Sequence, residues 1–131
     1  MVAMIAMMIH AFIMVESSGD DLAVGDGGRA IGCLQITERC LEDVNRIERV
    51  LAKKSGATPR QFTPNDRLDR KKSIEMAETY LSWYAKDYER KTGRKATPRI
   101  LSLIWNAGPY SQSKIPITEH YWCKVKSVLH I

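Results

Sequence analysis

Glu16 is the residue in this sequence whose surroundings could give it unusual chemistry. It closes a run from Met1 to Val15 that holds no charged residue, and Gly19 follows it closely. If that run is a buried helix, the Glu16 carboxyl lies at the edge of an apolar core, where burial and the helix dipole both disfavour its charge. A carboxyl that stays protonated near neutral pH can act as a general acid. The alternative is that Glu16 is an ordinary surface glutamate at a helix end.

Four short motifs then follow one another along the chain. They are Glu16-Ser17, Gly32-Cys33-Leu34-Gln35 within a glycine-rich stretch, Trp105-Asn106-Ala107-Gly108, and Tyr121. In this order they resemble the catalytic region of the lysozyme-like superfamily, and the nearest branches are the soluble lytic transglycosylases, the goose-type lysozymes and related phage or bacterial muramidases. The resemblance covers nearly the whole chain. It implies a mainly α (α+β) lysozyme-like fold, a helical bundle around a buried N-terminal helix with a small β-like, glycine-rich lip over a saccharide groove.

The resemblance also implies a function and a set of site residues. The chain would cut the β-1,4 bond between N-acetylmuramic acid and N-acetylglucosamine in peptidoglycan, with Glu16 as general acid and base. The residues that would bind the saccharide are Ser17, Gln35, Trp105, Asn106 and Tyr121. Each of these residues could also be purely structural, and only their order along the chain favours a shared site.

Asp26 is the candidate for a second catalytic carboxylate. In lytic transglycosylases one glutamate acts first as acid and then as base, and the C6 hydroxyl of the sugar attacks to give a 1,6-anhydro product. In goose-type lysozymes, by contrast, aspartates before the Gly-x-x-Gln motif position a water, and the reaction is a hydrolysis. Asp26 lies nine residues before Gln35 and matches such a position, so hydrolysis stays open. The alternative is structural, because Asp26-Gly27 is also a typical tight-turn pair.

Length and composition limit the remaining choices. A chain of 131 residues fits one domain, which we expect to span residues 1–131 as a monomer. The three cysteines show no metal-ligand spacing, so we expect free or buried thiols, no metal and no cofactor. The apolar N-terminal run has no preceding Lys or Arg and no clear cleavage site, so we expect a core helix and neither an export signal nor stable membrane insertion. Action at the cell wall would then need a phage-lysis route or another form of export. The alternative is that residues 1–15 are a secretion signal or anchor.

The basic character of the chain leaves a second class of function open. A net charge of +5 favours anionic partners, which include nucleic acid, anionic lipid and the polymers of a bacterial wall. The Lys and Arg residues from 86 to 99 are either a solvated face or a surface for a polyanion. We expect peptidoglycan strands as the partner and no nucleic acid. The alternatives are a chitin-like substrate, a catalytically inactive sugar binder, or a basic helical protein that binds nucleic acid or membrane.

Caps and apolar periodicity predict the elements that would position these residues. The expected helices span about Ala3–Ser17, Glu38–Lys54 capped by Thr37, 70–92 capped by Asp69, Pro98–Trp105 capped by Thr97, and a last helix capped by Thr118. We expect a loop from Ser111 to Pro116. Around Asp26-Gly27, the segments Ala30-Ile31 and Leu34-Gln35-Ile36 could form short strands.

Overall fold

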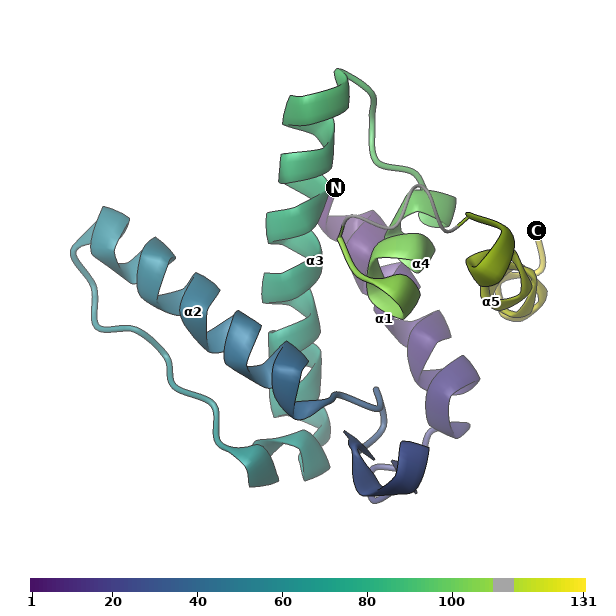
Figure 1. The fold of residues 1–131 in the computed structure, drawn as a ribbon, viewed down its shortest axis with the longest axis horizontal. Coiled ribbons are helices and arrows are strands. Elements are labelled where there is room, and N and C mark those ends of the chain that lie inside the picture. Colours follow the sequence, from purple (N-terminus) through teal and green to yellow (C-terminus); the bar gives the residue numbers. More distant parts are fainter. Residues whose placement is uncertain (110–114) are drawn as a thin grey trace. The chain divides into compact units, whose positions relative to one another are not determined.

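The structure is a computed structural model that describes residues 1–109 and 115–131 (Figure 1). The chain forms two compact units. Unit 1 consists of Met1–Val15 and Leu81–Ile131, and unit 2 consists of Glu16–Tyr80. The division falls within two helices, so the chain passes from one unit to the other at Val15–Glu16 and again at Tyr80–Leu81. The expected single domain over residues 1–131 stays a prediction.

Helices make up most of the described chain, as the fold prediction requires. The elements are α1 (Val2–Ser17), β1 (Val24–Gly25), the 3-10 turn η1 (Asp26–Gly28), β2 (Ala30–Ile31), α2 (Glu38–Ser55), the 3-10 turn η2 (Pro64–Leu68), α3 (Arg70–Thr92), α4 (Pro98–Ala107) and α5 (Ile115–Leu129). Five helices and one small antiparallel sheet agree with the mainly α class.

Three of the four predicted caps begin helices where the sequence indicates. The Thr37 side chain accepts a hydrogen bond from the Cys40 backbone N–H (3.2 Å) at the start of α2. Asp69 accepts from the Lys72 N–H (3.0 Å) at the start of α3, and both bonds satisfy N–H groups that have no partner within the helix. Thr97 accepts from the Ile100 N–H (3.2 Å) and begins α4 in the same way.

Helix α1 is confirmed, but its burial is one-sided. Met8 and Phe12 are fully buried, whereas Met7 is 44% and Met14 is 41% exposed. Some of the apolar side chains of this helix therefore lie outside the core. A helix that is apolar nearly all round predicts full burial, and α1 departs from that expectation on the face that carries Met7 and Met14.

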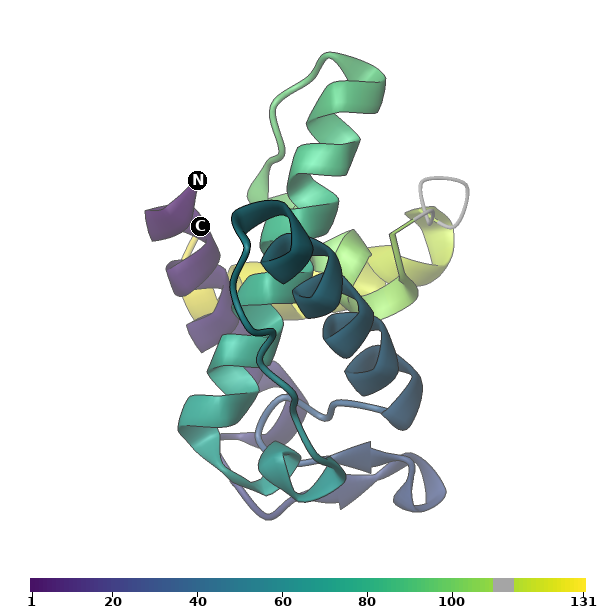
Figure 2. The same ribbon diagram turned by 90° about the vertical axis from the view of Figure 1, so that its left-hand side faces the viewer.

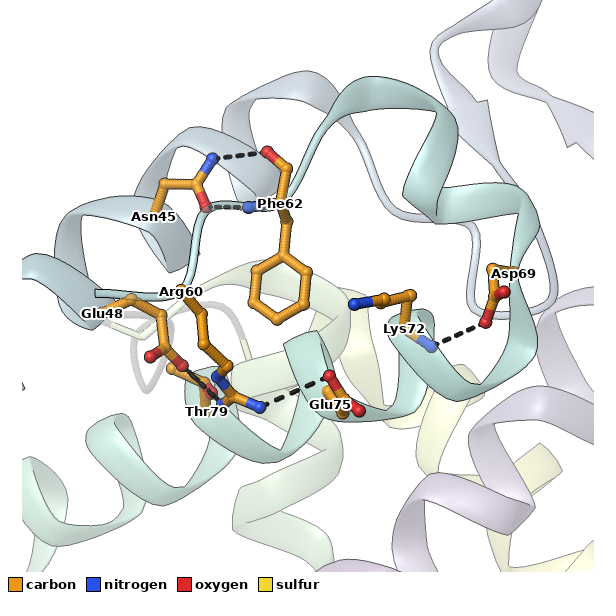
Figure 3. A network of polar contacts seen from close by, with 8 residues as sticks. All are labelled: Asn45, Glu48, Arg60, Phe62, Asp69, Lys72, Glu75 and Thr79. Atoms are coloured by element: carbon orange, nitrogen blue, oxygen red, sulfur yellow. Dashed lines mark hydrogen bonds and ion pairs between the residues drawn. The ribbon is translucent and has the colours of Figure 1, made fainter. Parts of the chain in front are cut away.

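In unit 2, a polar network ties α2 to the segment that follows it and to α3 (Figure 3). The buried Asn45 side chain donates to the Phe62 carbonyl and accepts from the Phe62 N–H, both at 2.9 Å. Arg60 Nη2 donates to Glu48 Oε1 (2.6 Å) and to Thr79 Oγ1 (3.1 Å), and the Thr79 hydroxyl donates to the same Glu48 oxygen (2.7 Å). These contacts hold an otherwise irregular segment against two helices.

The glycine-rich stretch of unit 2 forms a short hairpin beside the start of α3 (Figure 2). Val24 pairs with Ile31 and Gly25 with Ala30, so Asp26-Gly27 lies in the connection, as predicted. The partner strand is Val24–Gly25, whereas most of Leu34-Gln35-Ile36 forms a turn and only Ile36 makes a bridge, to Ile31. The strand predicted over Leu34-Gln35-Ile36 is therefore wrong for Leu34 and Gln35, because the turn that begins at Gly32 reverses the chain at once.

Unit 1 contains α4 and α5, which pack against each other. Helix α5 begins at Ile115, three residues before the predicted cap at Thr118. Pro116, which we expected in the loop, lies in the first helical turn, where proline is tolerated because its missing N–H has no helical partner. Residues 111–114 of the predicted loop lie outside the described part of the chain.

Candidate active site

Glu16 lies in the last turn of α1 and is half-buried. The helix ends immediately after it, because Ser18 and Gly19 both adopt left-handed backbone conformations, with φ of 55° and 88°. Gly19 takes up such a conformation without strain, whereas Ser18 does so at some cost. The side chain at position 16 therefore lies at the point where the chain leaves the helix and enters the glycine-rich loop.

Ser17 joins the end of α1 to the turn that carries Gln35. Its hydroxyl donates a hydrogen bond to the Cys33 carbonyl (2.8 Å) and accepts one from the Gly19 N–H (3.2 Å). The Glu-Ser and Gly-x-x-Gln motifs, separated by 16 positions, thus form one loop within unit 2. The Ser17 hydroxyl therefore links the end of α1 to the Gly-x-x-Gln turn.

The Gln35 side chain is fixed by backbone carbonyls of the same loop. Its Nε2 donates to Gly32 O (3.0 Å) and to Ala23 O (3.3 Å). Both amide hydrogens are therefore used within the protein, so Oε1 is the atom that could accept a hydrogen bond from a substrate. Gln35 also has a left-handed backbone, with φ of 53°, which turns its side chain back over the hairpin.

Two glycines make this arrangement sterically possible. A Cβ added at Gly25 would lie 2.3 Å from Gln35 Oε1, so the bare backbone at position 25 leaves room for the amide. A Cβ added at Gly32 would lie 1.7 Å from the Arg67 carbonyl oxygen, and Gly32 itself has φ of 85°. The backbone of η2 thus touches the Gly-x-x-Gln turn directly, with no space for a side chain between them.

The segment from Arg67 to Ser73 braces the loop from the start of α3. Arg70 Nε donates to Asp21 Oδ1 (2.8 Å), and its Nη2 donates to the Gly19 carbonyl. Arg67 Nη1 donates to the Ile36 carbonyl (3.0 Å), and the Ser73 hydroxyl donates to the Arg67 carbonyl (2.9 Å). Neither arginine was a candidate from the sequence, because the contacts span 31 to 51 positions and follow no local pattern.

Cys33, between Ser17 and this brace, is almost fully buried, at 1% exposed. Burial raises the pKa of its thiol, an effect that the nearby Arg70 charge opposes. A thiol kept protonated reacts slowly, so the position behaves as a small apolar residue. Cys40 and Cys123 are free thiols as well.

Asp26 lies on the hairpin connection and is exposed. Its Oδ1 forms an ion pair with Arg29 Nη2 (3.1 Å), and its Oδ2 accepts from Arg29 Nε (3.3 Å). The hydrogen bonds and the charge of Arg29 lower the pKa of the Asp26 carboxyl, so it is ionised at neutral pH. These contacts support the turn role of Asp26 directly.

The remaining candidates, Trp105, Asn106 and Tyr121, belong to unit 1. Trp105 stacks on the Phe12 ring at a centroid distance of 6.0 Å and an interplanar angle of 6°, and Tyr121 packs on the same ring at 5.9 Å. Asn106 is exposed at the end of α4. Sequence reasoning missed Phe12, although its place one helical turn before Glu16 was a usable signal.

Residues 1–109 and 115–131 contain no group of three or more His, Cys, Asp or Glu side chains that could hold a metal ion. In the same residues, no helix combines the length and apolar character needed to cross a bilayer.

Comparison with known proteins gives one match. The family model described as the transglycosylase SLT domain matches residues 3–110. Searches of curated proteins and of solved structures found no match.

Proposed function

This chain belongs to the transglycosylase SLT domain family, whose members act on peptidoglycan, and from that premise we propose that it cleaves the bond between N-acetylmuramic acid and N-acetylglucosamine with Glu16 as general acid and base. The family match extends from residue 3 to residue 110 and includes three of the four motifs. We propose further that the chain is a single catalytic domain, acts at the bacterial cell wall and is a monomer.

The contact between Ser17 and the Cys33 carbonyl is the observation that most supports this site. It brings the Glu-Ser dipeptide and the Gly-x-x-Gln turn into one loop, with Glu16 beside them in sequence and Gln35 held by two backbone carbonyls. An acid at a helix end, in the same loop as a fixed amide acceptor, suits a saccharide whose hydroxyl or acetamido N–H binds to that acceptor.

In the proposed reaction the Glu16 carboxyl donates its proton to the glycosidic oxygen as the bond from that oxygen to C1 breaks. An oxocarbenium-like centre develops at C1. The Glu16 carboxylate then takes the proton of the C6 hydroxyl of the same muramic acid, and the C6 oxygen bonds to C1. The products are a new chain end with a free hydroxyl and a 1,6-anhydro end, and no water is consumed.

Other residues would support this reaction by binding the saccharide. Gln35 would accept from the sugar through Oε1, and Asn106 would hydrogen-bond the saccharide through its exposed amide. Trp105 would lie beside the saccharide, and Tyr121, which is buried against Phe12, would help to hold the cleavage site. These roles rest on the order of the motifs in the sequence.

Hydrolysis is the alternative outcome at the same acid. It would require Asp26 to position a water, and its carboxylate would have to act while it is paired with Arg29. The ionised state of Asp26 at neutral pH favours a base there, whereas its exposure and its two bonds to Arg29 favour the turn role. The two reactions differ in their products.

The test is mass spectrometry of soluble fragments released from purified peptidoglycan. Glu16→Gln replaces the acid with an amide of equal size and should lower fragment release by about 10²–10⁴-fold while the fold is retained. Glu42→Gln, an exposed glutamate on α2, is the matched control and should leave release unchanged. Fragments with 1,6-anhydro ends support transglycosylation, and fragments with one added water support hydrolysis. Undiminished release by a folded Glu16→Gln variant would refute the assignment.

A further inference from the structure

The charge of this protein is divided unequally between its two units. Unit 1 contains nine Lys or Arg and three Asp or Glu residues, a net charge of +6. Unit 2 contains eleven basic and twelve acidic residues, a net charge of −1. The net charge of +5 of the whole chain therefore comes from unit 1, so an anionic partner would be attracted to that unit.

Within unit 1 the positive charge is concentrated in residues 86–99, which we call the basic segment. In Figure 1 this is the last part of α3, the connection that follows it and the start of α4. Its basic residues are Lys86, Arg90, Lys91, Arg94, Lys95 and Arg99, and its acidic residues are Asp87 and Glu89. Six of the nine cations of the unit thus lie within fourteen consecutive positions.

The acids near the basic segment are already in use. The Asp87 carboxylate pairs with Arg90 and also with Lys91, whose Nζ lies 3.0 Å from Oδ2. Glu89 Oε2 accepts a hydrogen bond from the Ala96 backbone N–H (2.7 Å). One carboxylate therefore serves two cations, and the other is bound to the backbone.

Three cations of the segment remain unmatched. Lys86, Arg94 and Lys95 are exposed, and in the part of the chain that the structure describes none of them takes part in an ion pair. Arg99 donates to Glu119 at 2.8 Å, so it is the member whose charge is best compensated. The surface that remains is positively charged and lies open to solvent.

The helix dipole explains only part of this arrangement. Cations in the last turn of a helix interact favourably with its C-terminal end, which accounts for Arg90 and Lys91 in α3. Gly93 ends that helix with φ of 70°, and Arg94 and Lys95 lie beyond it. Positive charges this close together repel one another, and an anionic partner would reduce that repulsion.

We propose that the basic segment is a docking surface for the carboxylates of peptidoglycan peptide stems. This inference rests on the proposed function, because it takes the substrate of that reaction as the partner. Stem peptides carry free carboxylates repeatedly along each glycan strand, and several separate cations fit a repeated anion better than one deep pocket would. Arginine forks bind carboxylates in pairs of hydrogen bonds, and lysines add charge. The surface retains the enzyme on the wall and takes no part in bond cleavage.

The test measures binding to insoluble peptidoglycan sacculi by co-sedimentation in the cold, where cleavage does not contribute. The variant Lys86→Gln/Arg94→Gln/Lys95→Gln removes three exposed charges from unit 1. The matched control, Lys53→Gln/Arg39→Gln/Lys71→Gln, removes the same number and kind of exposed charges from unit 2. We expect the first variant to bind about tenfold more weakly than the wild type and the control to bind within about twofold of it. Added salt should strongly weaken binding of the wild type and of the control, but should weaken binding of the first variant much less.

Two further arms identify the anion. In the first arm, the carboxylates of the sacculi are converted to neutral amides. The wild type should bind these amidated sacculi as weakly as the first variant binds untreated sacculi. Equal sedimentation of the two triple variants, or unchanged binding to amidated sacculi, would overturn the proposal. Tighter binding to a short DNA duplex, with the duplex displacing sacculi, would overturn it in favour of nucleic acid. If the triple variant does not fold, the single variant Arg94→Gln, which lies beyond the end of α3, is compared with the wild type in its place.

The outcome is separable from that of the cleavage experiment. A wild type that binds sacculi through the basic segment but releases no fragments would reject the proposed function and retain the docking surface. A wild type that releases fragments while the two triple variants bind equally would retain the function and reject the surface.

Discussion

Gln35 shows how much of the role of a proposed binding residue is decided by its immediate backbone. The sequence indicates an amide with both a donor and an acceptor, but the structure uses the donor internally, at Gly32 and Ala23. Only the carbonyl oxygen is then presented to a substrate. The position of that oxygen depends in turn on the missing side chain of Gly25.

Gly25→Ala should therefore impair substrate binding more than stability. The backbone at Gly25 is extended, with φ of −133°, so alanine is compatible with it, and the new methyl group would push the Gln35 amide aside. We expect KM to rise by about tenfold for the loss of one good hydrogen bond, with an unfolding free energy within about 1 kcal/mol of the wild type. Steady-state kinetics and urea unfolding measure both quantities. An unchanged KM would show that Gln35 does not contact the substrate.

At the scale of elements, the first turn of α3 acts as a brace for the loop after Glu16-Ser17, which is the loop proposed to carry the chemistry. Arg70 contacts the loop at Gly19 and Asp21, directly after Glu16-Ser17. Its side chain is 44% exposed, so the ion pair itself adds little to stability. Its effect should instead appear in the geometry of the catalytic residues.

Arg70→Ala should lower kcat by about tenfold through misplacement of Glu16, with the unfolding free energy reduced by about 1 kcal/mol or less. Arg46→Ala is the matched control. Arg46 is 46% exposed, lies in the same unit and pairs with Asp43 of its own helix. The kcat of Arg70→Lys, which retains the positive charge but not the forked guanidinium group, should lie between that of the wild type and that of Arg70→Ala. Equal kcat values for Arg70→Ala and Arg46→Ala would contradict the brace.

The network around Glu48 makes the stability of unit 2 dependent on pH. Burial by itself raises the pKa of the Glu48 carboxyl, but the hydrogen bonds from Arg60 and Thr79 and the charge of Arg60 outweigh it, so the pKa lies below its usual value. A carboxyl with a lowered pKa in the folded state stabilises the fold above its unfolded pKa of about 4.3. That contribution is lost as the pH falls through the lower, folded value.

Glu48→Gln should therefore destabilise the protein by about 1–2 kcal/mol at neutral pH and by less in acid. Urea unfolding at pH 7 and at pH 3 gives the two differences from the wild type. Glu42→Gln, an exposed glutamate on the same helix, is the control. A difference that stays equal at both pH values would show that the charge of Glu48 is not what stabilises the network.

Local signals allowed most helices to be predicted, and long-range contacts explain what was missed. Thr37, Asp69 and Thr97 begin helices because a cap is satisfied within three residues, so it can be read from the sequence. Pro116 misled the prediction of α5 because proline is typical both of loops and of a first helical turn.

The candidate site was predicted less completely than the fold. The motif residues could be named, but their fixing by Arg67 and Arg70 depends on contacts across 31 to 51 positions. Leu51 illustrates the same limit in the core. It follows the apolar period of α2, yet it is 42% exposed, and Ala52 is buried instead. Which side of a helical stripe is covered depends on partners that periodicity does not reveal.

At the scale of the whole molecule, the tryptophans offer a test of whether the two units unfold together. Trp83, Trp105 and Trp122 all belong to unit 1, so tryptophan fluorescence reports on that unit, whereas far-ultraviolet circular dichroism reports on the helices of both. A single domain over residues 1–131 predicts coincident urea transitions by the two probes. Separate midpoints would show that each unit unfolds by itself.

The brace on the catalytic loop also has a consequence for the order of folding. Its contacts join Ile36 to Arg67, Asp21 to Arg70 and Gly19 to Arg70. Helices form from local bonds, whereas closing long loops costs entropy before any contact repays it. The loop after Glu16 is therefore expected to take its shape after α2 and α3 have formed. During synthesis residues 19 to 36 leave the ribosome before residue 70, so the segment proposed to carry the chemistry would become ordered only after its later partners have emerged.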